Sequence, residues 1–289
     1  MKDNEDNAHD GCPEPLIGDG VTPGIVRIGH TVRRPARPFS ATIQAYLAHL
    51  HAVGFTGAPI PMGFDQDGRE VLSYVPGEVP REPLPSEAAT DQVLIALAQL
   101  IRHLHEASQS WIPPGDAVWG GLPGNSTTPR IDHPAELVSH RDYCPGNVVF
   151  CEGRPVALID FDLARPTTRL YDIANALYWW APLWDPIDRA PAFVQANIPE
   201  RVALFANAYG MSTSQRRDLV PLAERMIRRF HASARRAAEV DPVFRRLWEQ
   251  SGQRLPRAEQ WIATEGPNIT AQLLLSGPEP SETYSPNSR

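Results

Sequence analysis

Apolar positions follow two different periods along this chain, and the change falls close to residue 77. Before it, the runs GIVRIG, HTVRRP and REVLSYV are typical of strands and surround one segment, SATIQAYLAHLHAVG, whose apolar residues have helical spacing. That segment has Ser40 as a candidate N-cap and ends at Gly54. The pattern predicts a small β-sheet with one helix packed on one of its faces.

Helical patterns dominate from the turn signal Pro76-Gly77 to about residue 275. The segment TDQVLIALAQLIRHLHEAS carries one apolar stripe, made by Leu94, Leu97, Ile101 and Leu104. In DLVPLAERMIRRFHASARRAA a second stripe is made by Leu219, Leu222, Met226 and Phe230. We interpret the arginines on the other faces of this second helix as a solvated surface rather than a binding patch.

The strand-like pattern before residue 77 and the helical pattern after it predict an α+β protein with two lobes. At 289 residues the chain exceeds the size at which a single hydrophobic core usually stops growing. We expect a β-rich N-terminal lobe over residues 15–77 and a larger, mostly helical lobe over residues 78–275. Residues 1–14 and 276–289 are rich in Pro, Ser, Asn and charge, and we expect them to be disordered tails.

Composition and charge exclude several classes of protein. No apolar run approaches the roughly 20 residues that span a bilayer, so we expect no membrane insertion. The polar, acidic N-terminus does not resemble a secretory signal, and the three cysteines lack metal-ligand spacing, which favours reduced thiols and a cytoplasmic location. A net charge of −7 argues against non-specific nucleic-acid binding and mildly favours a cationic small substrate. The only lysine is Lys2, so a phosphate-binding site must use arginine.

The candidate chemistry lies between residues 140 and 162, where HRDYCPGNVVF is followed by CEGRPVALIDFD. NVVFC and PVALIDF are short strand-like runs joined by a turn that contains Gly153, so they predict a β-hairpin. Asp142 then lies on the preceding loop, Asn147 at the start of the first strand and Asp160 at the end of the second. Because the hairpin is antiparallel, Asn147 and Asp160 should lie near the same end.

This arrangement predicts a phosphoryl-transfer centre. Mg²⁺ takes a few hard protein oxygens, here from Asn147 and Asp160, and completes its octahedron with water and substrate phosphates. The separate carboxylate of Asp142 can accept the proton of an attacking hydroxyl group. The sequence contains no G-x-S-x-G, C-x-x-C, H-E-x-x-H or Walker motif, so hydrolase, zinc and P-loop chemistry lack a starting residue.

The order and spacing of H-x-D-x-x-x-x-N and I-D-F resemble the kinase-like phosphotransferases, specifically the aminoglycoside phosphotransferase group and its relatives that phosphorylate choline, homoserine and fructosamines. The resemblance implies a protein kinase-like fold, ATP or GTP as donor, Mg²⁺, and a small-molecule alcohol as acceptor, such as an aminoglycoside-like or other amine-bearing compound. It implies Asp142 as catalytic base and Asn147 and Asp160 as Mg²⁺ ligands.

Three further residues of this region receive supporting roles. The resemblance implies that His140 is structural and that Asp172, in LYDIANALYWW, braces the catalytic loop; an ordinary helix N-cap is the alternative for Asp172. Asp162 lies two residues after Asp160 and either assists the metal or caps a turn. Both alternatives stand at this point.

The N-terminal region resembles the nucleotide-binding lobe of a bacterial subgroup that is also labelled for trifolitoxin immunity. SYVPG is similar to the hinge on which adenine rests, with contacts from Ser73, Tyr74 and Val75. A short turn that covers the phosphates is implied for glycines at the start of the lobe, namely Gly18, Gly20 and Gly24.

The lysine that binds phosphates in kinases is absent from this lobe. Arg33 stands closest to its place, and Arg34 points the other way if the strand alternates. A guanidinium can hold phosphates bidentately, so the exchange is compatible with nucleotide binding. The helix that follows offers no Asp or Glu as a partner for this arginine, and Gln44 is the nearest polar candidate.

Two functions remain in competition at this stage. One is an active small-molecule kinase built on Asp142, Asn147 and Asp160. The other is a degenerate kinase fold that acts as a binding or immunity protein without turnover, which the missing lysine and glutamate favour. The sequence does not select ATP over GTP, an acceptor or an oligomeric state. Acidic candidates for acceptor binding in the helical region are Asp185, Asp188, Glu224 and Asp241.

Overall fold

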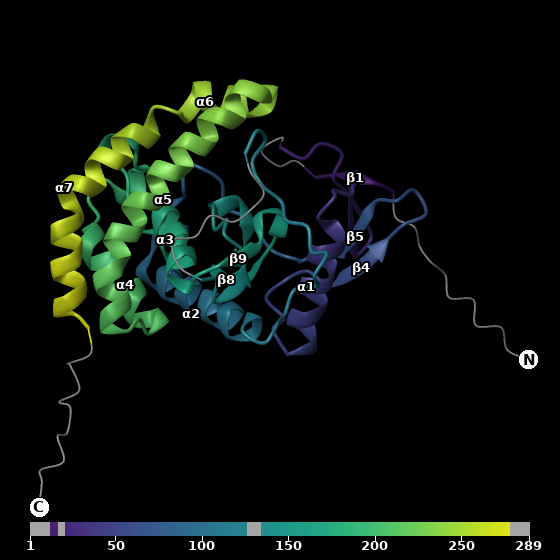
Figure 1. Cartoon of the computed structure of the whole chain (residues 1–289), viewed down its shortest axis with the longest axis horizontal. Coiled ribbons are helices and arrows are strands. Elements are labelled where there is room, and N and C mark those ends of the chain that lie inside the picture. Colours follow the sequence, from purple (N-terminus) through teal and green to yellow (C-terminus); the bar gives the residue numbers. More distant parts are fainter. Residues whose placement is uncertain (1–11, 17–20, 126–133, 278–289) are drawn as a thin grey trace, which may run out of the picture.

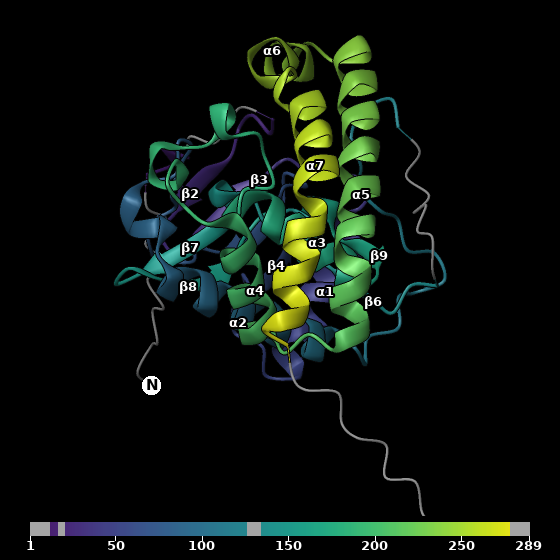
Figure 2. The same cartoon turned by 90° about the vertical axis from the view of Figure 1, so that its left-hand side faces the viewer.

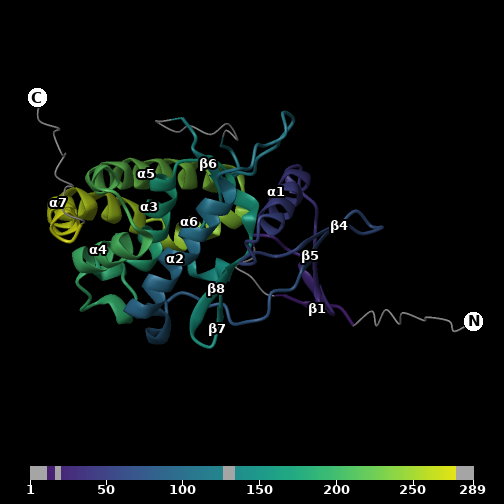
Figure 3. The same ribbon diagram turned by 90° about the horizontal axis from the view of Figure 1, so that it is seen from below.

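The structure, a computed structural model, describes residues 12–16, 21–125 and 134–277. Gly18 and Gly20, and most of the two predicted tails, lie outside the described residues. A sheet with one helix forms one end of the molecule and a group of helices forms the other, with two small hairpin-like sheets between them (Figures 1 and 3). The predicted α+β class, β-rich first and mostly helical afterwards, is confirmed. The lobe boundaries at residues 77 and 78 stay a prediction.

The N-terminal sheet is antiparallel and has the strand order β1-β2-β3-β5-β4. Its strands are β1 (Glu14–Pro15), β2 (Val26–Ile28), β3 (Thr31–Arg34), β4 (Pro61–Phe64) and β5 (Glu70–Ser73). Helix α1 (Ser40–Ala52) packs beside this sheet and buries the apolar stripe that the sequence predicts.

Ser40 differs from its predicted role as helix N-cap. It is the first residue of α1, and Phe39 occupies the N-cap position without a side-chain cap bond. The Ser40 hydroxyl instead accepts a hydrogen bond from the Arg37 N–H at 3.0 Å and lies 3.1 Å from a Glu70 carboxylate oxygen. Its side chain therefore connects the helix start to β5.

The helical region follows a linker that contains the short 3-10 helix η1 (Ser86–Ala89). Its α-helices are α2 (Asp91–Ser108), α3 (Arg169–Trp180), α4 (Ile198–Tyr209), α5 (Thr213–Val240), α6 (Pro242–Ser251) and α7 (Arg254–Leu275). Two further 3-10 helices, η4 (Pro186–Asp188) and η5 (Pro191–Phe193), lie between α3 and α4. Helices α5 and α7 run side by side along one flank (Figure 2). No helix in the described ranges is both long and apolar enough to cross a bilayer.

Two small antiparallel pairs lie between the helices and the large sheet. They are β6 (Leu137–Ser139) with β9 (Arg165–Thr167), and β7 (Val148–Cys151) with β8 (Arg154–Leu158). The β7–β8 hairpin is the one that the sequence predicts. Its two turn residues, Glu152 and Gly153, both have positive φ, as a type I′ turn requires.

Backbone contacts join the linker to the β7–β8 hairpin. Glu78 and Phe150 exchange both of their backbone hydrogen bonds, at 2.8 and 2.7 Å. Gly77 precedes this bridge with φ of 146°, and a Cβ atom at this position would collide with the Phe150 carbonyl oxygen. Only glycine tolerates both conditions, so the turn signal at residue 77 marks the point where the linker meets the β7–β8 hairpin.

Candidate active site

Asp142 lies on the loop between β6 and β7, and His140 holds this loop in place through two hydrogen bonds. The Asp142 backbone N–H donates to His140 Nδ1 at 3.2 Å, so Nε2 carries the proton and donates to the Ile159 carbonyl at 2.9 Å. Burial lowers the pKa of His140, which keeps this imidazole neutral. His140 thus connects the Asp142 loop to the segment that leads to Asp160.

Asn147 holds the Asp142 carboxylate. Its amide nitrogen donates to Asp142 Oδ2 at 2.9 Å and to the Asp142 backbone carbonyl at 3.1 Å. Asn147 ends the 3-10 helix η2 (Pro145–Asn147), directly before β7 rather than as its first residue. Its own carbonyl accepts from the Ile159 N–H at 2.9 Å, so the hairpin brings Asn147 beside the residue that precedes Asp160.

Asp160 directly follows Ile159. Its backbone is in the left-handed conformation, with φ of 61°. An aspartate is among the few residues other than glycine that adopt this conformation at modest cost. The Asp160 side chain is 45% exposed and accepts a hydrogen bond from Arg34 Nη1 at 3.1 Å. It is the most accessible carboxylate of the group.

Asp162 also accepts from Arg34, through Nη2 at 2.6 Å. It lies in the short 3-10 helix η3 (Phe161–Leu163), which has no side-chain cap bond. The interpretation of Asp162 as a turn cap is therefore wrong, and its observed partner is a guanidinium.

Arg34, rather than Arg33, is the arginine at these carboxylates. The expectation that Arg34 points away is wrong, because its guanidinium reaches Asp160, Asp162 and, at 2.8 Å through Nε, Glu70. Arg33 lies near Asp65 instead, at 3.7 Å. Alternation along β3 places the two arginines on opposite faces, and the packing of α1 decides which face is the interior.

The carboxylate partner of this arginine comes from β5 and not from the helix. Glu70 is fully buried and lies directly opposite Arg34 in the strand register. Gln44 Nε2 donates to its other oxygen at 3.0 Å, and Ser40 completes the set. The sequence interpretation missed Glu70; the signal available was its place at the start of a strand expected to pair with the strand of Arg34.

Negative charge is in excess at this centre. Glu70, Asp160 and Asp162 face the single guanidinium of Arg34, whose pKa they raise although burial alone would lower it. Burial, followed by the charge of Asp160, raises the pKa of Asp142 to about 7.

The donor set fits Mg²⁺. The Asn147 amide donates both of these hydrogen bonds through its nitrogen, so its oxygen is the atom suited to a metal, together with the accessible carboxylate of Asp160. Within the described ranges no cluster of three or more His, Cys, Asp or Glu has metal-binding geometry. A magnesium ion needs only one or two carboxylates beside substrate phosphates and water, and a divalent cation would offset the excess negative charge.

A buried network fixes the loop from the helical side. Asp172 accepts hydrogen bonds from the Tyr143 hydroxyl and from His105 Nε2, the latter at 2.9 Å, and His105 Nδ1 lies 2.8 Å from the Tyr209 hydroxyl. Burial alone would raise the pKa of Asp172, but its hydrogen bond with His105 leads the effects that lower it. Thr168 is the N-cap of α3, so the N-cap alternative for Asp172 is wrong.

The segment formed by residues 116–120 crosses the site. The Val118 N–H donates to Thr42 of α1 at 3.0 Å, and the carbonyl of Gly120 accepts from Arg165. A Cβ atom on Gly120 would collide with the Asp162 carbonyl oxygen. Glycine is therefore required where this segment contacts the backbone beside Asp160.

The predicted hinge residues lie at the end of β5. The Ser73 N–H donates to the Ile60 carbonyl at 2.9 Å and the Tyr74 N–H to the His30 carbonyl at 2.8 Å. The Tyr74 ring lies under the Arg27 guanidinium, 4.0 Å from its centroid. Val75 alone of the three shows no backbone N–H bond to another residue in the described part of the chain.

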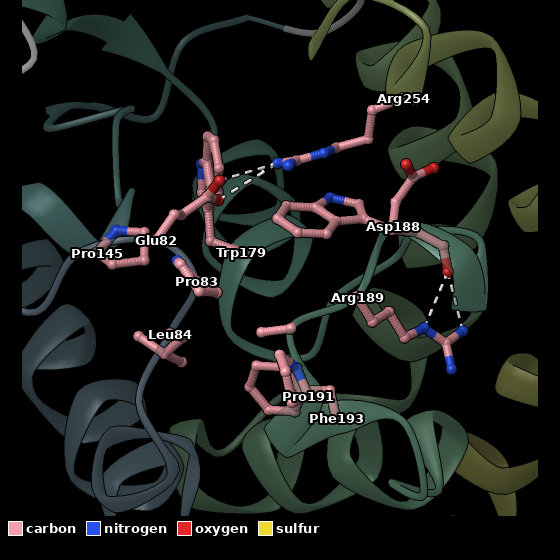
Figure 4. A pocket seen from close by; sticks show the side chains of 12 residues that line it. Glu82, Pro83, Leu84, Pro145, Trp179, Asp188, Arg189, Pro191, Phe193 and Arg254 are labelled. Atoms are coloured by element: carbon pink, nitrogen blue, oxygen red, sulfur yellow. Dashed lines mark hydrogen bonds and ion pairs between the residues drawn. The ribbon is translucent and has the colours of Figure 1, made fainter. Parts of the chain in front are cut away.

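A separate cavity of about 300 Å³ lies on the helical side of the Asp142 loop. Pro145, in the loop that carries Asp142, forms part of its wall. Trp179 and Trp184 line it too, and Figure 4 shows the Trp179 side chain at its border.

Comparison with known proteins gives two sequence matches. A model described as "Phosphotransferase enzyme family" matches residues 119–205. The trifolitoxin immunity protein of Rhizobium leguminosarum bv. trifolii is 34% identical over 206 residues, which are 70% of this chain and 75% of that protein.

Solved structures share the fold. A choline/ethanolamine kinase family protein from Mesorhizobium loti superposes with a TM-score of 0.62 at 16% identity, covering 93% of this chain and 94% of that one. Aminoglycoside 2′-phosphotransferase-IIIa in its GDP complex gives a TM-score of 0.52 at 14% identity, covering 90% and 95%. At these identities the likeness shows the fold alone, and it confirms the two-lobed kinase-like class.

Proposed function

The chain belongs to the phosphotransferase enzyme family, and on that premise we propose that it moves the γ-phosphoryl group of ATP or GTP, with Mg²⁺, to a hydroxyl group of a small molecule. The proposal is carried by the hydrogen bonds of Asn147. Its side-chain amide donates to the Asp142 carboxylate, and its backbone carbonyl accepts from Ile159, the residue that precedes Asp160. A base, its orienting group and a metal-suited carboxylate thus lie on one hairpin and its loop.

Each residue has a distinct part in this proposal. Asp142 accepts the proton of the acceptor hydroxyl, and Asn147 keeps its carboxylate oriented. The Asn147 oxygen and the Asp160 carboxylate hold Mg²⁺, which when bound offsets the charge of the transferring phosphoryl group. His140 supports the loop through its bonds to Asp142 and Ile159, and Asp172 supports it through Tyr143.

Arg34 replaces Arg33 in the proposed contact with the donor phosphates. Its guanidinium lies between the buried Glu70 and the two aspartates beside the proposed metal position. Nη1 and Nη2 of Arg34 contact the more accessible carboxylates, and a planar guanidinium can bind two phosphate oxygens at once. Ser73, Tyr74 and Val75 remain our proposal for the contact with adenine or guanine. In this proposal the backbone N–H of Val75 donates a hydrogen bond to the base.

The second candidate is a binding or immunity protein that retains a partner without turnover. The name of the 34% identical relative favours it. The sequence argument for this candidate was the absence of a lysine–glutamate pair, and the Arg34–Glu70 pair weakens that argument.

Nucleotide turnover and binding, measured separately, distinguish the two candidates. We expect wild-type protein to release ADP or GDP in the presence of Mg²⁺ and an alcohol acceptor, and Asp142→Asn to bind nucleotide with unchanged affinity but to lose turnover. The matched control is Asp116→Asn, an exposed carboxylate on the segment that crosses the site, which should behave as wild type. Equal turnover by Asp142→Asn and wild type would reject Asp142 as the base. If cells that express Asp142→Asn were protected from a toxic compound as fully as cells that express the wild type, the binding or immunity protein would be favoured.

A further inference from the structure

Two arginines lie next to each other where β6 leads into the Asp142 loop. Arg165 is the first residue of β9 and lies directly opposite Ser139, the last residue of β6 (Figure 2). The chain then leaves β6, and Arg141 is the second residue beyond Ser139. The Arg141 guanidinium lies over the ring of Tyr171 in α3, 4.2 Å from its centroid. Strand pairing and the start of α3 thus bring the two arginines together.

The charge that faces Arg165 is another positive charge. Burial, followed by the charge of Arg141, lowers the pKa of Arg165 to about 10, so Arg165 is still a cation at neutral pH. Arg201, whose pKa burial also lowers, has the carboxylate of Asp91 as its charged neighbour instead. In the described part of the chain no carboxylate contacts Arg141 or Arg165. The pair therefore lacks an anion that would offset its two charges.

Most of the N–H groups of these two guanidiniums are available to a ligand. Arg165 donates through Nη2 to the Gly120 carbonyl, which is a neutral partner. The contact of Arg141 with the Tyr171 ring uses none of its N–H groups for a hydrogen bond. Across the residues that the structure describes, no nitrogen of either arginine is among the buried side-chain atoms that lack a hydrogen bond. The unused donors are therefore open to solvent.

The backbone of Arg141 is strained at the same place. Its φ is 64°, in the left-handed region, which costs a residue with a β-carbon about 1–2 kcal/mol. Glycine adopts this conformation without that cost. Strained residues cluster at binding and catalytic sites, where the side chain has a role that offsets the strain. The arginine side chain at this position is thus a candidate for ligand binding.

We propose that Arg141 and Arg165 together bind a phosphate-type oxyanion. Two guanidiniums carry two positive charges, and each can donate N–H groups to two oxygens, which matches a tetrahedral dianion. The bound anion replaces the repulsion between the arginines with two charge-assisted contacts. Because Arg141 directly precedes Asp142, this site lies beside the loop of the proposed base. The inference concerns binding alone and does not depend on phosphoryl transfer.

Inorganic phosphate is the probe for this site. Its binding to the full chain is measured by calorimetry at neutral pH, at constant ionic strength set with sodium chloride and without nucleotide or Mg²⁺. We expect saturable binding, and we expect Arg141→Gln and Arg165→Gln each to weaken it about tenfold, as the loss of a hydrogen bond to a charged group does. The matched control is Arg217→Gln, an exposed arginine of α5, which should bind phosphate as the wild type does.

Arg141→Gly separates phosphate binding from folding. The substitution removes the guanidinium but relieves the left-handed strain, which offsets the lost contact with Tyr171. Without phosphate its thermal unfolding midpoint should stay close to that of the wild type, while its affinity for phosphate falls about tenfold. Added phosphate should raise the midpoint of the wild type and leave that of Arg141→Gly nearly unchanged.

Glycerol 3-phosphate distinguishes a free phosphate from one carried by a larger molecule. If it binds more tightly than inorganic phosphate and loses affinity in the same variants, the site takes a phosphate monoester; equal or weaker binding assigns the site to the free anion. Glycerol should not bind. Lack of saturable phosphate binding by the wild type would overturn the proposal. Undiminished phosphate affinity in folded Arg141→Gly and in Arg165→Gln would place the anion elsewhere, such as at Arg34, and would also overturn it.

Discussion

Replacing Glu70 by Gln tests whether the Arg34–Glu70 pair positions the proposed phosphate contact. The carboxylate is fully buried and accepts from Arg34, Ser40 and Gln44, so an amide of equal size must turn its NH₂ group toward at least one donor. Losing one hydrogen bond to a charged group costs about 1.5–3 kcal/mol. Complete loss of a buried ion-pair partner costs about 3–5 kcal/mol, and Asp160 and Asp162 still compensate Arg34. We therefore expect a loss of about 2–3 kcal/mol.

Urea unfolding measures that loss, and nucleotide KM measures its consequence for the site. With Glu70 neutral, Arg34 should bind Asp160 and Asp162 more closely and be less available to the donor phosphates. KM for the nucleotide should therefore rise about tenfold, or about 1.4 kcal/mol. Asp67→Asn, an exposed carboxylate in the adjacent β4–β5 turn, is the matched control and should change stability by less than about 0.5 kcal/mol.

A double-mutant cycle with Arg34→Gln completes the experiment. Because the two side chains touch at 2.8 Å, the coupling energy should be about 2 kcal/mol. Additive effects of the two substitutions, or an unchanged KM in Glu70→Gln, would refute the assignment of Arg34 as a contact oriented by Glu70.

Three other perturbations test the proposed base Asp142, the segment that contains Gly120, and Asp172, which braces the Asp142 loop. The pKa of Asp142 is raised to about 7, and the base acts only when deprotonated, so log kcat/KM should fall with a slope near one as the pH drops through that value; a flat profile would contradict the role. Gly120→Ala forces a Cβ against the Asp162 carbonyl, so kcat should fall while unfolding shows a loss of about 1–3 kcal/mol; wild-type values would show that the segment moves freely. The folded-state pKa of Asp172 is lowered, so its stabilisation is present above the unfolded value near 4 and is lost as the pH falls through the folded value; in Asp172→Asn this acid dependence of unfolding should disappear, and its persistence would assign it to other groups.

Local patterns were sufficient to predict helix α2 and the β7–β8 hairpin. The stripe of α2 is buried as its spacing predicts, and the glycine turn between β7 and β8 has the expected positive φ values. Likewise the four residues between Asp142 and Asn147, together with the length of the hairpin, bring the Asp142 carboxylate, the Asn147 amide and the residue before Asp160 close together. These relations depend on short stretches of chain, whose geometry is set by hydrogen bonding and turn chemistry.

Partners far apart in the sequence were decided only by the tertiary structure. Period-two alternation says that Arg33 and Arg34 face opposite sides of β3, but the face covered by α1 makes Arg34 the interior residue. Glu70 becomes its partner through a strand pairing that spans 36 residues. The sequence by itself determined which chemical groups exist and their local order; the packing of separate segments decided which charges remain available, because burial and pairing are properties of the assembled chain.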